Sequence, residues 1–175
     1  MTNFDYLKDC EGVKHLYELC CEVECRQTSD PGTSALYARN VLDWIVQAIY
    51  RLENIGDANG KSLFQLMNDD KFVRYINDAS MMQTLHYIRK IGNIGAHNPS
   101  SVKRNESYFV LRQLHGAVGA VLMKFGLISS FPDFDDNLIP KKPRLRVAPT
   151  ATAKSVSDEV QTVKATPKQG SLNKS

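Results

Sequence analysis

The chain has 175 residues, of which 42% are hydrophobic, so it has room for one domain of ordinary size and an appendage. It contains no apolar run of about 18 residues, which predicts no membrane span. The first residues, Met1 to Asp5, lack the basic and then apolar order of a secretory signal, so we expect a cytoplasmic protein.

The net charge of +3 is unevenly distributed. Residues 141–175 contain eight Lys and Arg residues against two acidic ones, a net charge of +6. The other 140 residues contain 14 basic and 17 acidic residues, a net charge of −3. The basicity of the whole chain therefore does not by itself indicate a folded domain that binds nucleic acid.

Neither the cysteines nor the histidines have the spacing of metal ligands. The four cysteines, at positions 10, 20, 21 and 25, form no C-x-x-C pair and favour reduced thiols in a core. His86 and His115 lie on expected helices without partners at ligand spacing. Phosphate-cradling glycine loops are absent as well. We therefore expect neither a metal nor a cofactor.

Helical periodicity extends from the N-terminus to about residue 128. A first amphipathic helix is predicted by a stripe that steps by three and four residues, at Val13, Leu16, Tyr17, Cys20 and Val23 or Glu24. Asp30 as a cap and Pro31 in the first turn begin a second helix. Its apolar stripe comprises Ala35, Ala38, Leu42, Ile45 and Ile49. Residues 54–60 have the composition of a loop.

Two short helices, over 63–67 and 72–76, are expected next. Asp78 or Ser80 then caps a longer helix that ends near 96–98, because Pro99 disfavours helix at the residue before it. Asn105 or Ser107 begins the last helix, and Gly126 is a suitable stop. Its apolar stripe comprises Leu111, Leu114, Val118, Val121, Leu122 and Phe125.

This pattern predicts an all-α fold, an antiparallel four-helix bundle with two short extra helices between its second and third members. No stretch alternates in the manner of a strand. The bundle is expected over 1–128, followed by a strap or linker over 129–140 whose Phe131 and Phe134 fold back onto it. Residues 141–175, rich in Lys, Ser, Thr, Ala and Pro, are expected to be disordered.

The segment 89–97 carries the strongest candidate for chemistry. Arg89, Asn93 and His97 are four residues apart and share one face of a continuous helix. His97 is suited to act as an acid or base, and Arg89 to hold a phosphate, which together suit metal-free RNA cleavage. The alternative is structural: polar residues near a helix end satisfy backbone groups there, and Arg89 pairs with an acid on a facing helix.

Two glycines, Gly92 and Gly95, lie within the same segment. Each costs roughly 1 kcal/mol relative to alanine inside a helix, so something must compensate. The two candidates are close packing against a neighbouring helix and a ligand that approaches the backbone. On the second helix, Arg39 and Asp43 at i and i+4 are expected to form a surface ion pair.

The sequence from Ile88 to His97, IRKIGNIGAH, resembles the IRKLGN-x-x-A-H signature of a HEPN-like helical family. Its domains occur at the N-terminus of type I restriction-enzyme motor subunits, in related helicases and in small defence proteins. Supporting matches are the opening NFDYL and the residues around Ala38–Arg39 and Trp44, and the resemblance covers roughly 1–127. It implies a HEPN-like bundle, a homodimer and a role in restriction or phage defence.

The chain departs from the active ribonucleases of the HEPN group, in which four to six residues separate the Arg from the His. Here seven residues separate Arg89 from His97. In those ribonucleases a polar residue such as Asn usually follows the Arg directly, whereas the residue directly before Asn93 is Gly92. Compared with the Arg of those ribonucleases, Arg89 is displaced by one helical turn, about 5 Å along the axis. Catalysis needs its groups positioned more finely than that. A non-catalytic module is therefore the favoured interpretation.

Three functions follow from these residues. The first is a non-catalytic binding and assembly module that contacts RNA, DNA or a restriction or helicase subunit, with Lys90, Lys103 and Arg104 as a basic rim. The second is a metal-independent endoribonuclease that uses His97 with Arg89 or Lys90, with Asn93 orienting these groups. The third is a nucleic-acid binder that acts through the basic tail.

Overall fold

The computed structural model describes residues 1–141, and within them it contains helices and no strands. The predicted all-α class is confirmed. The longer helices are α1 (Lys14–Arg26), α2 (Pro31–Leu52), α5 (Ala79–His97) and α6 (Arg104–Lys124), and the short ones are α3 (Leu63–Met67) and α4 (Asp70–Ile76). Short 3₁₀ turns are η1 (Asp5–Leu7), η2 (Pro99–Ser101) and η3 (Asp136–Leu138). None of these helices is long and apolar enough to cross a membrane.

Side-chain caps explain where most of the helices begin. The Asp30 carboxylate accepts a hydrogen bond from the Thr33 N–H at the start of α2, and Pro31 occupies the first turn as predicted. Asp78, rather than Ser80, caps α5 by accepting from the Met81 N–H. Ser62 and Gln65 form a capping box on α3.

The predicted start of α6, at Asn105 or Ser107, is wrong. The helix begins at Arg104, because the Glu106 carboxylate reaches back and accepts from the Lys103 N–H at 2.8 Å. Ser107 is fully buried inside the helix. At the other end, Gly126 adopts the left-handed conformation (φ +72°), and the Leu127 N–H donates to the Leu122 carbonyl, which closes α6.

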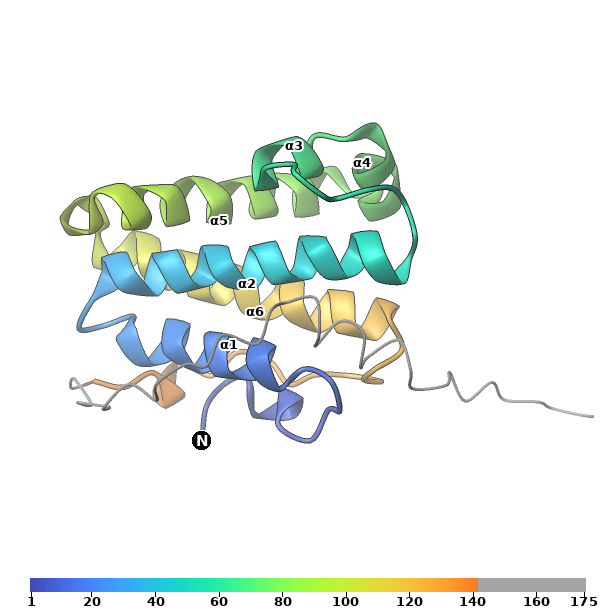
Figure 1. The fold of residues 1–175 in the computed structure, drawn as a ribbon. Helices are drawn as coiled ribbons and strands as arrows, with labels where there is room; N and C mark the ends of the chain where they lie inside the picture. The colour runs from blue at the N-terminus through green and yellow to red at the C-terminus, as the bar shows by residue number, and fades with distance from the viewer. Residues whose placement is uncertain (142–175) are drawn as a thin grey trace, which may run out of the picture.

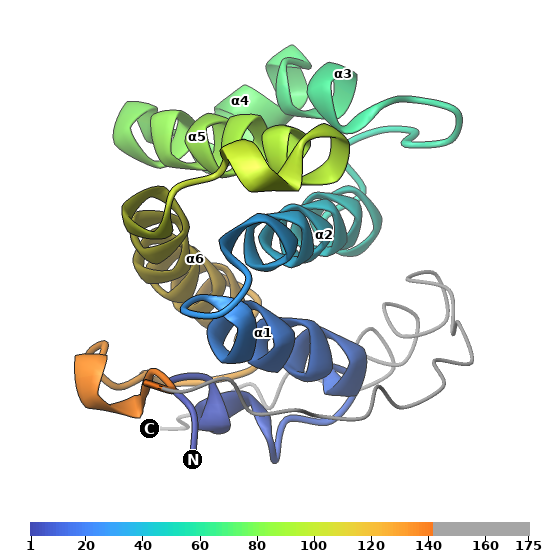
Figure 2. The ribbon, with the colours of Figure 1, turned by 90° about the vertical axis from the view of Figure 1, so that its left-hand side faces the viewer.

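Helix α2 lies at the centre of the molecule and contacts α1, α5 and α6 (Figures 1 and 2). Its buried residues cover most of its circumference, and Trp44 is its largest fully buried side chain. A partly exposed strip remains at Leu36, Asn40, Asp43 and Gln47. The short helices α3 and α4 lie over α5 on the side away from α1 (Figure 2). Its contacts with the three other long helices make α2 the element on which the others are positioned.

The N-terminal segment and the segment after α6 lie side by side along α1 and α6 (Figure 2). Asn3 joins them, because its Nδ2 donates to the Asp135 carbonyl at 3.0 Å and its Oδ1 accepts from the Asp135 N–H at 2.6 Å. Phe131 covers Gly119 of α6. The segment predicted as a strap or linker thus contacts the bundle, and the predicted disordered basic tail lies outside the described residues from position 142 onward.

Candidate functional site

Arg89, Asn93 and His97 lie along one face of α5, but Arg89 and His97 are far apart. Eight residues at a rise of about 1.5 Å each separate them by about 12 Å along the axis. The Arg89 guanidinium carbon lies 4.8 Å from the centre of the Phe64 ring, and Arg89 Nε is buried without a hydrogen-bond partner. His97 is exposed as the last residue of α5, and Asn93 is partly buried.

Gly92 and Gly95 allow α5 to contact the backbone of α2 directly. A Cβ atom on Gly95 would overlap the Gly32 carbonyl oxygen, and one on Gly92 would lie 2.9 Å from the Ala35 carbonyl oxygen. Of the two compensations considered for these glycines, the structure contains the close helix packing. Gly92 and Gly95 of the segment 88–97 therefore serve the α2–α5 contact.

Arg39, expected to form a surface ion pair with Asp43, lies at the contact between α2 and α5. Its Cβ lies directly against Gly92, and its Nε is buried without a hydrogen-bond partner. Within residues 1–141, no ion pair between Arg39 and Asp43 is found, so the predicted pair is not formed. Burial raises the pKa of the half-buried Asp43 carboxyl, and the charge of Arg39 opposes that rise.

His97 ends α5, and Lys103 and Arg104 stand at the start of α6. Figure 1 shows that the end of α5 and the start of α6 lie at the same end of the bundle. Arg104 donates to the Thr28 carbonyl at 3.0 Å and lines a cavity of about 420 Å³ together with Lys141. Lys103 is exposed. Lys90 is exposed too, but it lies two turns back along α5, so it is separate from the other residues of the predicted rim.

A second group of residues surrounds His115 of α6, for which the sequence predicts no site. His115 is only 3% exposed and is surrounded by four aromatic rings, those of Phe4, Tyr6, Phe131 and Phe134, with centroids 5.5–5.6 Å from its own. These rings come from the two ends of the described chain. The expectation from the sequence that Phe131 and Phe134 fold back onto the bundle is the one indication of these surroundings.

Burial lowers the pKa of His115, against smaller opposing contributions from the Asn3 backbone and Asp133. A histidine whose pKa is lower in the folded state binds a proton less readily there than in the unfolded chain. The free energy of unfolding therefore falls as the pH drops below the unfolded pKa of about 6.5. We therefore expect His115→Phe to reduce the loss of unfolding free energy between pH 7.5 and pH 5.0, measured by urea denaturation. Phe134→Leu, which removes a ring but no titrating group, should keep the wild-type loss. Equal losses in wild type and His115→Phe would contradict this assignment.

The described residues include no group of three or more His, Cys, Asp or Glu side chains placed to hold a metal ion. Among the cysteines, Cys20 is fully buried, and burial raises the pKa of its thiol, which disfavours the nucleophilic thiolate. The candidate residues therefore remain the polar face of α5, the bundle end and the surroundings of His115.

The described residues form an all-α protein in which Gly92 and Gly95, within the segment 88–97, bring α5 against the backbone of α2. No protein-family model, no curated protein and no solved structure matches the chain.

Proposed function

We propose that this protein is a non-catalytic binding and assembly module of a prokaryotic restriction or antiviral system, with a HEPN-like arrangement of its helices. In this proposal it is a cytoplasmic homodimer that acts beside a restriction or helicase subunit. The bundle end, defined as His97, Lys103 and Arg104, is its contact with RNA or DNA.

One observation carries the non-catalytic form of the proposal: the Arg89 guanidinium lies over Phe64, about two helical turns from His97. General acid–base catalysis with phosphate stabilisation needs both groups within hydrogen-bond reach of one phosphodiester. Within one chain, these two residues do not meet that requirement. The exposed Lys103 and the neighbouring Arg104 support phosphate contacts at the bundle end instead.

The proposal is tested by incubating the full chain with fluorescein-labelled single-stranded RNA and duplex DNA in EDTA, measuring anisotropy and then RNA length on a gel. We expect intact RNA with wild type, His97→Ala and Asn93→Ala alike. Lys103→Glu/Arg104→Glu should weaken binding roughly tenfold or more, because two phosphate contacts become repulsive. The matched control Lys8→Glu/Lys14→Glu reverses two exposed charges elsewhere and should weaken binding much less.

Cleavage of RNA by wild type, abolished in both His97→Ala and Asn93→Ala, would replace the proposal with the endoribonuclease. Equal weakening by the two double reversals would remove the bundle end as the contact. Binding lost only when residues 141–175 are deleted would assign it to the basic tail. Absence of nucleic-acid binding in wild type would leave a partner subunit as the target of the module.

A further inference from the structure

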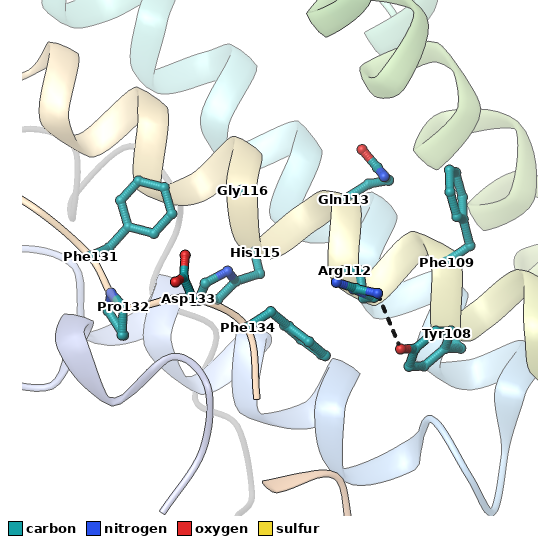
Figure 3. Close-up of a pocket in the computed structure, with 10 residues that line it drawn as sticks. All are labelled: Tyr108, Phe109, Arg112, Gln113, His115, Gly116, Phe131, Pro132, Asp133 and Phe134. Atoms are coloured by element: carbon teal, nitrogen blue, oxygen red, sulfur yellow. Dashed lines mark hydrogen bonds between the residues drawn. The ribbon is translucent and has the colours of Figure 1, made fainter. Parts of the chain in front are cut away.

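A cavity of about 510 Å³ opens between α6 and the segment 131–134, separate from the α5 face (Figure 3). This volume lies within the range of roughly 300–1,000 Å³ typical of small-molecule sites. The α6 side of the cavity presents Arg112, His115 and Tyr108, and the segment presents Phe134 and Asp133 (Figure 3). The lining thus combines aromatic surface with a few polar groups, as ligand sites commonly do.

The absence of a side chain at Gly116 helps to keep the cavity open. A Cβ atom at Gly116 would meet no atom within 4 Å, whereas one at Gly119 would lie 2.5 Å from the Phe131 ring. One turn of α6 is therefore covered by an aromatic side chain, and the turn before it is left open. The cavity is a feature of how the segment 131–134 crosses α6.

His115 lines this cavity and has one ring nitrogen, Nε2, without a hydrogen-bond partner among the described residues. Its lowered pKa keeps the imidazole neutral at pH 7, and the ring is hydrogen-bonded to the Asn3 backbone, a contact that raises the pKa. A contact that raises the pKa is one in which the ring N–H donates. His115 Nε2 is buried and has no hydrogen-bond partner in the described residues. A neutral imidazole whose other nitrogen donates has an acceptor at Nε2.

Arg112 supplies a cation in the same cavity. Its guanidinium carbon lies 5.6 Å from the Phe134 ring centre and 5.9 Å from that of Tyr108, and its Nη1 donates weakly to the Tyr108 hydroxyl at 3.5 Å. No ion pair of Arg112 is found within residues 1–141. The guanidinium is therefore held by aromatic surface, with its charge available to an anion.

We propose that this cavity binds a small anion that contains an aromatic or heteroaromatic ring, one phosphate or carboxylate group and a hydrogen-bond donor. The anionic group pairs with Arg112, the ring lies against Phe134, and the donor reaches His115 Nε2 after a small displacement of the surrounding rings. Asp133, on the segment side, disfavours a second anionic group near it. Tyr108 also lines the cavity that Arg104 borders at the bundle end, but this proposal does not rest on the proposed nucleic-acid contact there.

The proposal is tested by isothermal titration calorimetry on the full chain with two probe classes, the nucleoside monophosphates AMP and GMP and the aromatic carboxylate 4-hydroxybenzoate. We expect at least one class to bind with a dissociation constant below about 1 mM. Arg112→Gln should weaken that binding roughly tenfold or more, through loss of a charge-assisted contact. Arg74→Gln removes an exposed arginine elsewhere and should leave binding unchanged.

Gly116→Leu provides a second test, because it fills the cavity with a good helix former where no atom is displaced at Cβ. We expect it to abolish binding without lowering the melting temperature. Binding by only one of the two probe classes would support the proposal and would show whether the anionic group of the ligand is a phosphate or a carboxylate. The proposal is overturned if neither class binds wild type at millimolar concentration, if adenosine or phenol binds as tightly as the charged probes, or if Gly116→Leu binds normally.

Discussion

Gly95→Ala is expected to lower the free energy of unfolding by about 2 kcal/mol, although alanine is the better helix former. The new Cβ would overlap the Gly32 carbonyl oxygen and lie 3.1 Å from the Leu36 backbone nitrogen. Both atoms belong to the backbone of α2, which cannot rotate away as a side chain can. The separation of α5 from α2 that relieves the overlap costs more than the roughly 1 kcal/mol gained from helix propensity. Urea denaturation monitored by circular dichroism measures the change.

Gly116→Ala is the matched control for this substitution. It also lies inside a long helix, but its new Cβ would meet no atom within 4 Å. It should therefore raise the free energy of unfolding by roughly 0.5–1 kcal/mol, the ordinary gain of alanine over glycine in a helix. If Gly95→Ala is as stabilising as Gly116→Ala, the direct backbone contact between α5 and α2 does not exist.

The helices could be predicted from the sequence because their signals are local. Apolar spacing and caps such as Asp30 and Asp78 lie within one or two turns of the residues that they organise. The start of α6 was misplaced because Glu106 satisfies the Lys103 N–H with its side chain, which makes a lysine acceptable at the cap position. A cap formed from inside the helix is harder to recognise than an Asp or Ser before it.

The candidate site could be predicted only in part. Spacing alone predicted that Arg89, Asn93 and His97 share a face, and that two glycines in one helix need compensation. It could not select between a ligand and a neighbouring helix, because Gly32 and Ala35, which the glycines contact, lie about 60 residues earlier. The surroundings of His115 were missed for the same reason: its aromatic neighbours come from both ends of the described chain.

Asn3→Leu is expected to lower the free energy of unfolding by about 3 kcal/mol at pH 7, because it leaves buried polar groups unpaired. The Asn3 Nδ2 group donates to Glu24 Oε2 at 2.8 Å, and Glu24 is 2% exposed. The same side chain exchanges two hydrogen bonds with the Asp135 backbone. Leucine matches asparagine in shape but can make none of these bonds, so the N-terminal segment, α1 and the segment after α6 lose their common partner.

The pH dependence of this loss identifies its cause. Burial raises the pKa of Glu24, and hydrogen bonds from the backbone N–H and the side chain of Asn3 lower it. Asn3→Leu removes the side-chain bond, so it raises the pKa of Glu24 further. A carboxyl group with a raised pKa in the folded state destabilises the protein as the pH increases above its unfolded value of about 4.3. The difference between Asn3→Leu and wild type should therefore be larger at pH 7 than at pH 4.5, in urea denaturation at both pH values. In the Glu24→Met background, Asn3→Leu should cost less, and nearly the same at both pH values, because no buried carboxylate remains; an undiminished pH dependence there would assign it to another group.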